Sequence, residues 1–214
     1  LRQAAKVAVL ACGFAGGKVA LLAMARAYGM GTDEAEAQRL VDLWRKANPW
    51  APAMWQAAEG AYMRAMRNPG HEVSANRCTY LYDRTHLWYA LPSGRVLCYP
   101  FAKFDEDGSI SYAKAAWKPA ADAKEWPRAR LWVGVAVENI TQAAAHDVLR
   151  LALRRLDAEG IQAVAHTHDE ILVECDERSV EQVERRMREI MCDPPAWAPD
   201  LPLAVDGAVS RRYS

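Results

Sequence analysis

The sequence lacks net charge, because its 27 basic and 27 acidic residues cancel. Overall basicity therefore indicates neither a nucleic-acid partner nor a membrane surface. The distribution of charge is nevertheless uneven along the chain. Residues 1–32 contain no acidic residue, and their basic residues are Arg2, Lys6, Lys18 and Arg26. The N-terminal region is therefore locally positive.

The sequence also lacks paired cysteines and long apolar runs. Its five cysteines are widely spaced and form no Cys-x-x-Cys pair. Neither a disulfide framework nor a zinc site is indicated, and a reducing compartment is expected. No apolar run approaches the roughly 18 residues that span a bilayer, and no signal peptide is visible. We therefore expect no membrane partner.

The composition is that of a globular protein, with 51% apolar and 25% charged residues in a chain of 214. This length suits one large domain or two small ones, each with its own core. The chain begins with Leu1 and not with Met, so we expect a fragment or a processed piece.

The first 75 residues predict a helical subdomain. Glycines at 13, 16 and 17 end a first helix, and the apolar run 19–27 forms a second. A third helix over 34–47 begins at the capping-box-like Asp33-x-x-Glu36, and a fourth covers 50–67. We place the first subdomain at residues 1–75.

Residues 76–214 predict an antiparallel sheet with flanking helices, so the fold class is mixed α and β. The β-prone segments are 78–82, 86–90, 95–99 and 109–112, whereas 117–128 shows no clear period. A helix is expected over 142–156, and residues 162–175 predict strand, turn and strand. A helix that opens at Ser179-x-x-Gln182 and a final strand over 201–206 complete the second subdomain.

Four residues near the N-terminus recur at a spacing of four: Arg2, Lys6, Leu10 and Phe14. On an α-helix they follow one another along one face, each about 6 Å beyond the last. Such a stripe suits a nucleoside triphosphate, with its phosphates on the two cations and its base on the apolar pair. An ordinary amphipathic helix with two solvated charges explains the spacing as well.

The predicted hairpin presents His168-Asp169-Glu170 at its tip. Carboxylate oxygens are the ligands that Mg²⁺ prefers, and they leave positions open for phosphate. One aspartate cannot hold two ions, and Glu170 on a strand would point to the opposite face. Ordinary turn composition is one alternative. A metal-dependent hydrolase is another, in which His166, His168 and Asp169 begin a ligand set that needs further histidines.

The segment Asn139-Ile-Thr-Gln142 leads into the helix expected over 142–156. The amides of Asn139 and Gln142 both donate and accept hydrogen bonds, so they suit the base-edge acceptors of a DNA minor groove. Helix capping is the alternative interpretation.

Taken in this order, these segments resemble the C-terminal part of family A DNA polymerases, the DNA polymerase I family, and especially its bacteriophage-type members. Arg2-x3-Lys6-x3-Leu10-x3-Phe14-Ala-Gly16 is similar to motif B of the fingers. His168-Asp169-Glu170 is similar to motif C of the palm. Further similar landmarks are Glu138 to Asp147, Leu91-Pro-Ser-Gly-Arg95 and Leu201-Pro-Leu203.

The resemblance implies roles residue by residue. Arg2 and Lys6 would bind the triphosphate, with Lys6 counted among the catalytic residues. Leu10 and Phe14 would lie near the base, the sugar and the template-side stacking position. Asp169 would be the catalytic metal ligand and Glu170 its lesser partner. The DNA contacts near the primer terminus would come from Gln142 and His168 and, more weakly, Asn139.

The resemblance also implies the function: template-directed DNA polymerase activity, a nucleotidyl transfer from a deoxynucleoside triphosphate to a primer 3′-hydroxyl with two Mg²⁺ ions. Residues 1–75 would be fingers and 76–214 an incomplete palm of the right-hand fold. The partners would be primer-template DNA, the deoxynucleotide and a missing N-terminal part, in the cytoplasm of a bacterial or phage-infected cell.

Two departures from the family pattern bear on these expectations. Leu10 stands where an aromatic residue is usual, and Ala15 where glycine is usual. Motif A, with the other metal-binding aspartate, would lie before Leu1, so we expect this fragment to be inactive alone. The rival hypotheses are a non-catalytic nucleic-acid-binding module or split-polymerase subunit, which would not depend on Asp169, and the hydrolase, which would bind Zn²⁺.

Overall fold

The computed structural model describes residues 2–114 and 126–212, so most of the segment 117–128 lies outside the described residues. The chain divides into two compact units, residues 1–140 and 141–214. The subdomain boundary expected at residue 75 stays a prediction, and within the first unit a helix and a sheet pack together across that point.

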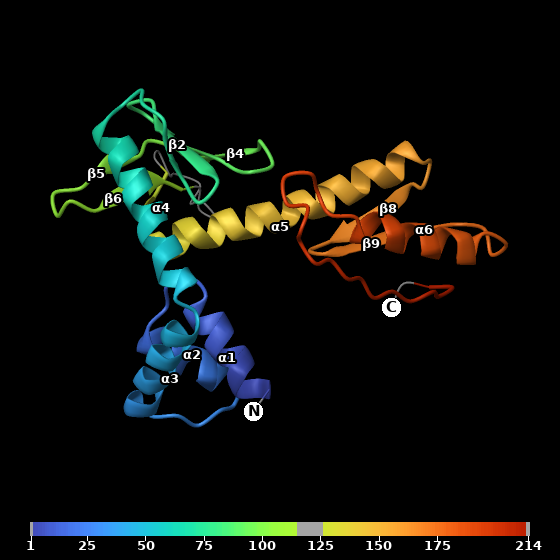
Figure 1. The fold of residues 1–214 in the computed structure, drawn as a ribbon, viewed down its shortest axis with the longest axis horizontal. Helices are drawn as coiled ribbons and strands as arrows, with labels where there is room; N and C mark the ends of the chain where they lie inside the picture. The colour runs from blue at the N-terminus through green and yellow to red at the C-terminus, as the bar shows by residue number, and fades with distance from the viewer. Residues whose placement is uncertain (1, 115–125, 213–214) are drawn as a thin grey trace. The chain divides into compact units, whose positions relative to one another are not determined.

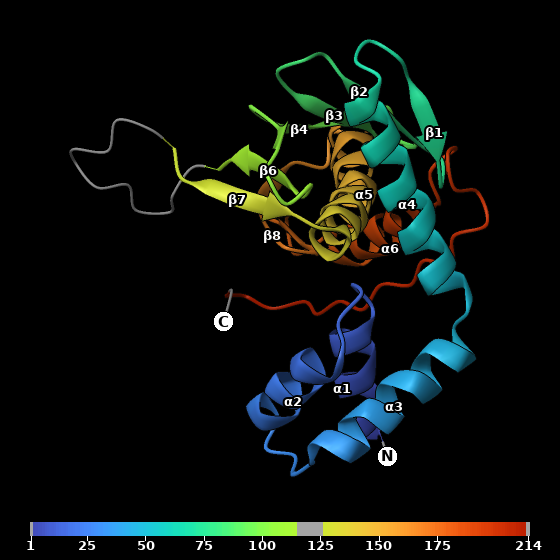
Figure 2. The same ribbon diagram turned by 90° about the vertical axis from the view of Figure 1, so that its left-hand side faces the viewer.

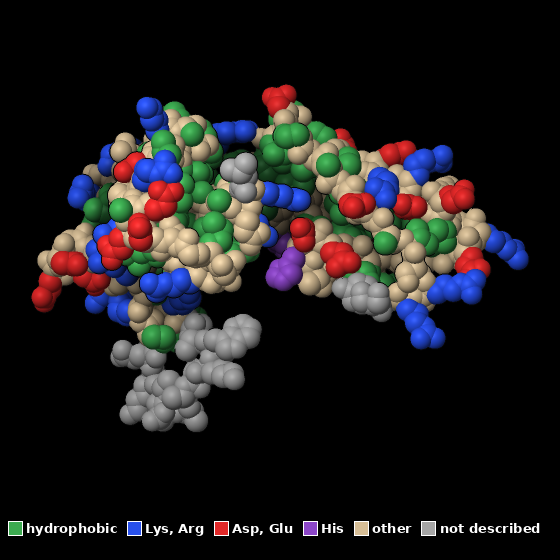
Figure 3. Space-filling model, turned by 90° about the horizontal axis from the view of Figure 1, so that it is seen from below, with side chains coloured by type: hydrophobic (Ala, Val, Ile, Leu, Met, Phe, Trp, Pro, Cys, Tyr) green, Lys and Arg blue, Asp and Glu red, His purple; other side chains and the backbone are tan. Residues whose placement is uncertain are grey.

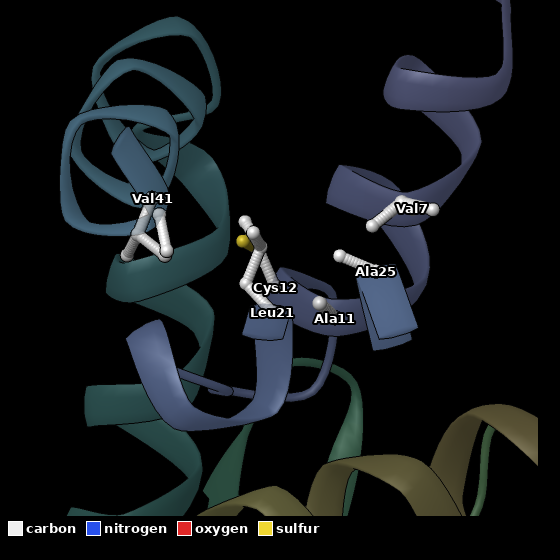
Figure 4. Packing of buried hydrophobic residues seen from close by; sticks show 7 residues of the cluster. Val7, Ala11, Cys12, Leu21, Ala25 and Val41 are labelled. Carbon is white, nitrogen blue, oxygen red and sulfur yellow. The ribbon is translucent and has the colours of Figure 1, made fainter. Parts of the chain in front are cut away.

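The first unit begins with three helices that share one core: α1 (Arg2–Cys12), α2 (Lys18–Ala27) and α3 (Glu34–Ala47). Their buried side chains meet between the helices, as Figure 4 shows. The buried residues of this core are Val7, Ala11, Cys12, Leu21, Ala25, Ala37 and Val41. The predicted start of α3 is confirmed, because the Asp33 carboxylate accepts a hydrogen bond from the Glu36 N–H at 2.8 Å.

The turn between α1 and α2 depends on a close approach at Gly16. A Cβ atom at this position would lie 1.9 Å from the carbonyl oxygen of Ala11. The preceding Ala15 adopts a positive φ of 61°. Only a residue without a side chain fits there, and the tight turn lets α2 fold back on α1.

We predict that Gly16→Ala destabilises the protein by about 2 kcal/mol or more, because the backbone must move to relieve the overlap. The matched control is Gly17→Ala, since a Cβ at Gly17 meets no atom within 4 Å. Urea unfolding followed by circular dichroism measures both variants. Equal stabilities of the two variants would contradict the close approach.

The fourth helix, α4 (Trp50–Arg67), packs on a four-stranded antiparallel sheet. The strands are β1 (Val73–Ala75), β2 (Cys78–Tyr82), β3 (Leu87–Ala90) and β4 (Val96–Tyr99), in the order β1-β2-β3-β4. Figures 1 and 2 both show α4 lying along this sheet. Strand β3 begins one residue later than predicted, because the His86 N–H donates to the Asp83 carboxylate in the turn before it.

A second antiparallel sheet follows in the first unit. Its strands are β5 (Lys103–Phe104), β6 (Ile110–Ala113) and β7 (Arg128–Leu131), in the order β5-β6-β7. The turn expected before residue 109 is confirmed, since the Gly108 N–H donates to the Asp105 carbonyl at 2.9 Å.

Five tyrosines form an aromatic cluster inside the first unit: Tyr62, Tyr80, Tyr89, Tyr99 and Tyr112. Neighbouring ring centroids lie 4.6 to 6.3 Å apart. Burial away from water disfavours the ionised phenolate. Burial therefore raises the pKa of Tyr99 to about 12, even though the hydrogen bond from Asn139 lowers it, and raises the pKa values of Tyr80 and Tyr89 still further.

We predict that the free energy of unfolding falls as pH rises from 10 towards 12. A raised folded-state pKa means that the unfolded chain loses its phenolic protons first, so the stabilisation present below pH 10 is lost through this window. The decrease should reach several kcal/mol, because one pKa unit corresponds to about 1.4 kcal/mol. Denaturant unfolding with tyrosinate absorbance measures it, and Tyr99→Phe should reduce the decrease. A stability curve that stays flat across this window would contradict the prediction.

The second unit is built on the long helix α5 (Val133–Ala158), whose C-terminal part belongs to it. The hairpin of β8 (Ala163–Thr167) and β9 (Glu170–Val173) and the helix α6 (Val180–Cys192) complete the unit. Buried Leu149, Ala152, Leu156, Ile171 and Ile190 form its core. The predicted strand, turn and strand over 162–175 is confirmed.

Three sequence-based expectations for this region are wrong. Helix α5 starts at Val133, nine residues earlier than predicted, because Val133, Ala136, Val137 and Ile140 continue the apolar period. The Ser179 hydroxyl does not cap α6 but donates to the Asp176 carbonyl. Residues 201–206 form no strand, because the Val205 carbonyl accepts from the Arg188 guanidinium and not from a neighbouring strand.

In the described ranges, 2–114 and 126–212, no helix is both long and apolar enough to cross a membrane. The mixed α and β fold class is confirmed, with helices and antiparallel sheets.

Candidate functional site

The helix α1 exposes three of the four residues of the predicted stripe. Arg2, Lys6 and Leu10 are exposed, whereas Val7 and Ala11 on the other side are buried against α2 and α3. The Lys6 ammonium lies 5.2 Å from the centroid of the Tyr28 ring. This cation–π contact holds the ammonium over an aromatic face while leaving it accessible to an anion.

Phe14 does not lie on this helix, which corrects the prediction of a four-residue stripe on one helical face. Helix α1 ends at Cys12, and the glycine-rich turn changes the direction of the chain. Phe14 is half-buried and packs against the core cluster that contains Trp55 and Val137. The helical period fails there because it holds only while the helix continues.

The basic residues in and near α1 differ in whether they form an ion pair. Lys18 forms an ion pair with Glu34 at 2.8 Å, whereas no ion pair joins Arg2 or Lys6 to any acidic group among the described residues. Basic and acidic side chains are interspersed on the face drawn in Figure 3. The exposed face of α1 therefore offers two cations that are available to an anionic ligand.

In the second unit the hairpin tip is a two-residue turn. Thr167 and Glu170 are paired across β8 and β9, so His168 and Asp169 form the turn between them. His168 adopts a positive φ of 52°. All four side chains of the tip are exposed. The structure thus places the carboxylate of Asp169 in solvent at the end of a hydrogen-bonded hairpin.

The tip borders a groove of about 490 Å³ within the second unit. Its polar side chains are Gln142 and His146 from α5 and His168 and Asp169 from the hairpin. The remaining lining is mostly apolar: Ala145, Val148, Leu149, Ala152, Met191, Leu203, Ala204 and Val205. We call this feature the tip groove. It brings together Gln142, His168 and Asp169, three of the residues singled out in the sequence.

The amide residues lie inside α5 and not before it, so the expectation that they precede a helix, and with it the capping alternative, is wrong. Gln142 is exposed and lines the tip groove. Asn139 belongs to the first unit, where its Nδ2 donates to the Tyr99 hydroxyl at 2.9 Å. Asn139 thus already has a partner within the chain, and its role as a DNA contact stays a prediction.

The tip groove is lined by the carboxylate of Asp169, which suits one ligand position of a magnesium ion. Mg²⁺ is usually held by one or two carboxylates, with phosphates and waters in its other positions. No three His, Cys, Asp or Glu side chains gather into a metal-binding group in the parts of the chain that the structure describes. Glu170 begins β9 beside Asp169, and its metal-binding role stays a prediction.

Sequence reasoning missed two residues of these sites. His146 lines the tip groove, and its spacing of four from Gln142 on a helix would have indicated a shared face. Tyr28 contacts Lys6, but it lies at the end of α2, and no short-range spacing connects it with α1. Such a contact follows only from the packing of α2 on α1.

The chain is similar to a protein named DNA polymerase from Bacillus phage SP02. The two are 37% identical over 213 residues, which is the whole of this chain and 32% of that protein. The chain therefore spans about a third of the length of the curated relative it matches. No family model matches the sequence, and no solved structure matches it.

Proposed function

We propose that this chain provides the deoxynucleotide-binding helix and a metal-binding carboxylate for template-directed DNA synthesis in a family A polymerase of the bacteriophage type. The observation that carries the proposal is the tip groove, where Gln142 from a helix lies with His168 and Asp169 from a hairpin. The likeness to a phage protein named DNA polymerase supports it over the full length of the chain.

The first contribution is the binding of the triphosphate by side chains of α1. Arg2 and Lys6 lie one helical turn apart on the exposed face of α1. A guanidinium donates paired hydrogen bonds to phosphate oxygens, and an ammonium adds a point charge. Leu10, 43% exposed on the same helix, offers an apolar surface to the base or sugar. These side chains hold the triphosphate so that its leaving group is neutralised.

The second contribution is the positioning of the primer terminus. Gln142 and His168 offer hydrogen-bonding groups at the polar edge of the tip groove, and the rest of its lining is apolar apart from His146 and Asp169. Asp169 would hold Mg²⁺ through a carboxylate oxygen. When bound, the ion supplies the positive charge that activates the attacking hydroxyl and stabilises the transferred phosphoryl group.

The first test measures binding of a deoxynucleoside triphosphate to the 214-residue chain. We expect Arg2→Ala and Lys6→Ala each to weaken binding about tenfold, because each removes a charge-assisted hydrogen bond. Arg26→Ala is the matched control, since Arg26 is an exposed cation of the same acid-free region on α2. Equal losses in all three variants would indicate non-specific attraction and contradict the assignment.

The second test places the chain in the corresponding third of the phage SP02 polymerase and measures primer extension. We expect Asp169→Asn to reduce extension about a thousandfold, since it removes a metal-binding charge worth several kcal/mol. The control is Glu174→Gln, an exposed acid just beyond β9. Unchanged extension by Asp169→Asn would contradict the catalytic role and favour a non-catalytic DNA-binding module. The isolated chain should not extend a primer with Mg²⁺.

A further inference from the structure

A row of three aromatic side chains lies on the first unit, outside the residues assigned above. The His86 ring lies between the other two, with ring centroids 5.5 Å from Trp88 and 5.2 Å from Phe101. Trp88 and His86 are half-buried, and Phe101 is 56% exposed. We call Trp88, His86 and Phe101 the aromatic row.

The backbone and neighbouring side chains hold the aromatic row in place. The Trp88 indole N–H donates to the Asp83 carboxylate at 2.8 Å, which fixes the orientation of the ring. Phe101 adopts a positive φ of 52°, and its carbonyl accepts a hydrogen bond from the Arg128 guanidinium at 2.9 Å. The first hydrogen bond orients the Trp88 ring, and the second restrains the backbone that carries Phe101.

Two basic residues lie close to the aromatic row along the chain. Arg84 precedes His86 by two residues, Lys103 follows Phe101 by two, and both are exposed. Of the acids nearby, Asp83 accepts hydrogen bonds from the Trp88 indole and from two backbone N–H groups, and Asp105 accepts one from the Ser111 hydroxyl. The hydrogen bonds to Asp83 hold the pKa of its carboxyl below its usual value, although desolvation alone would raise it.

We propose that the aromatic row binds unpaired DNA, with bases stacked on its rings and the phosphate backbone beside Arg84 and Lys103. Stacked bases and flanking cations are the two features by which proteins hold single strands without reading sequence. Inside a duplex both faces of each base are covered by stacked neighbours, so that one face of each terminal pair alone is open to these rings. The inference rests on the proposed function in one respect, because it takes the bound strand to be the single-stranded overhang of a template.

The experiment compares two labelled DNAs that share one duplex, the first blunt and the second with a single-stranded 5′ overhang. Fluorescence anisotropy measures their affinities for the 214-residue chain. We expect the chain to prefer the overhang DNA, and Trp88→Ala or Phe101→Ala to lower the affinity for that DNA about tenfold without changing blunt-duplex binding. Trp88→Phe keeps a stacking ring and should retain most of the preference.

Trp50→Ala is the matched control, because Trp50 is 61% exposed on α4 and belongs to no aromatic pair within the described residues. Circular dichroism checks the fold, and Phe101→Ala provides a loop variant should Trp88→Ala unfold the sheet. Equal affinity for the two DNAs, an unchanged preference in the row variants, or an equal loss on both DNAs would overturn the proposal. So would self-association that Trp88→Ala abolishes while DNA binding stays unchanged.

The two proposals fail separately. In one outcome, Trp88→Ala removes the preference for overhang DNA, whereas Arg2→Ala and Lys6→Ala leave nucleotide binding unchanged. This outcome would contradict the proposed function and support the aromatic-row proposal. In the opposite outcome, Arg2→Ala and Lys6→Ala weaken nucleotide binding, whereas the row variants leave DNA binding unchanged. This outcome would overturn the aromatic-row proposal alone.

Discussion

The burial of apolar side chains along α5 is the constraint on which both units depend. Val137 packs with Trp55 in the core of the first unit, and Leu149 and Leu156 pack against the hairpin and α6 in the second. The side of α5 that bears these residues is buried, whereas Gln142 lies on an exposed part of the helix. The exposure of Gln142 at the tip groove is therefore a consequence of core packing.

In the hairpin that carries Asp169, strand β9 is the one that packs against the core of the second unit. Ile171 on β9 is buried in the core of the second unit, whereas all five residues of β8 are exposed. Strand β8 is held by its pairing with β9. The position of the Asp169 carboxylate thus depends on how well Ile171 and Val173 pack, since little other burial restrains the turn.

Local signals in the sequence predicted most of the helices and the hairpin. The capping aspartate before α3 and the glycines after α1 act over a few residues, so the boundaries near them agree with the structure. The four-residue spacing of the N-terminal stripe was less reliable, because it assumed a helix that continues to Phe14. The chain beyond Leu201 was misjudged because the Arg188 guanidinium takes carbonyls that a strand would have paired. Non-local packing places Tyr28 beside Lys6, whereas the position of His146 beside Gln142 follows from their local spacing on α5.

The positive φ of His168 restricts which residues the hairpin tip accepts. Residues other than glycine rarely adopt this backbone conformation, but asparagine, aspartate and histidine adopt it more readily than β-branched residues do. A valine at this position would therefore disturb the turn as well as remove the imidazole. Mutational tolerance at residue 168 accordingly reflects two separate demands, one from the backbone and one from the ring. His168→Asn satisfies the first demand without adding a charge and so isolates the second.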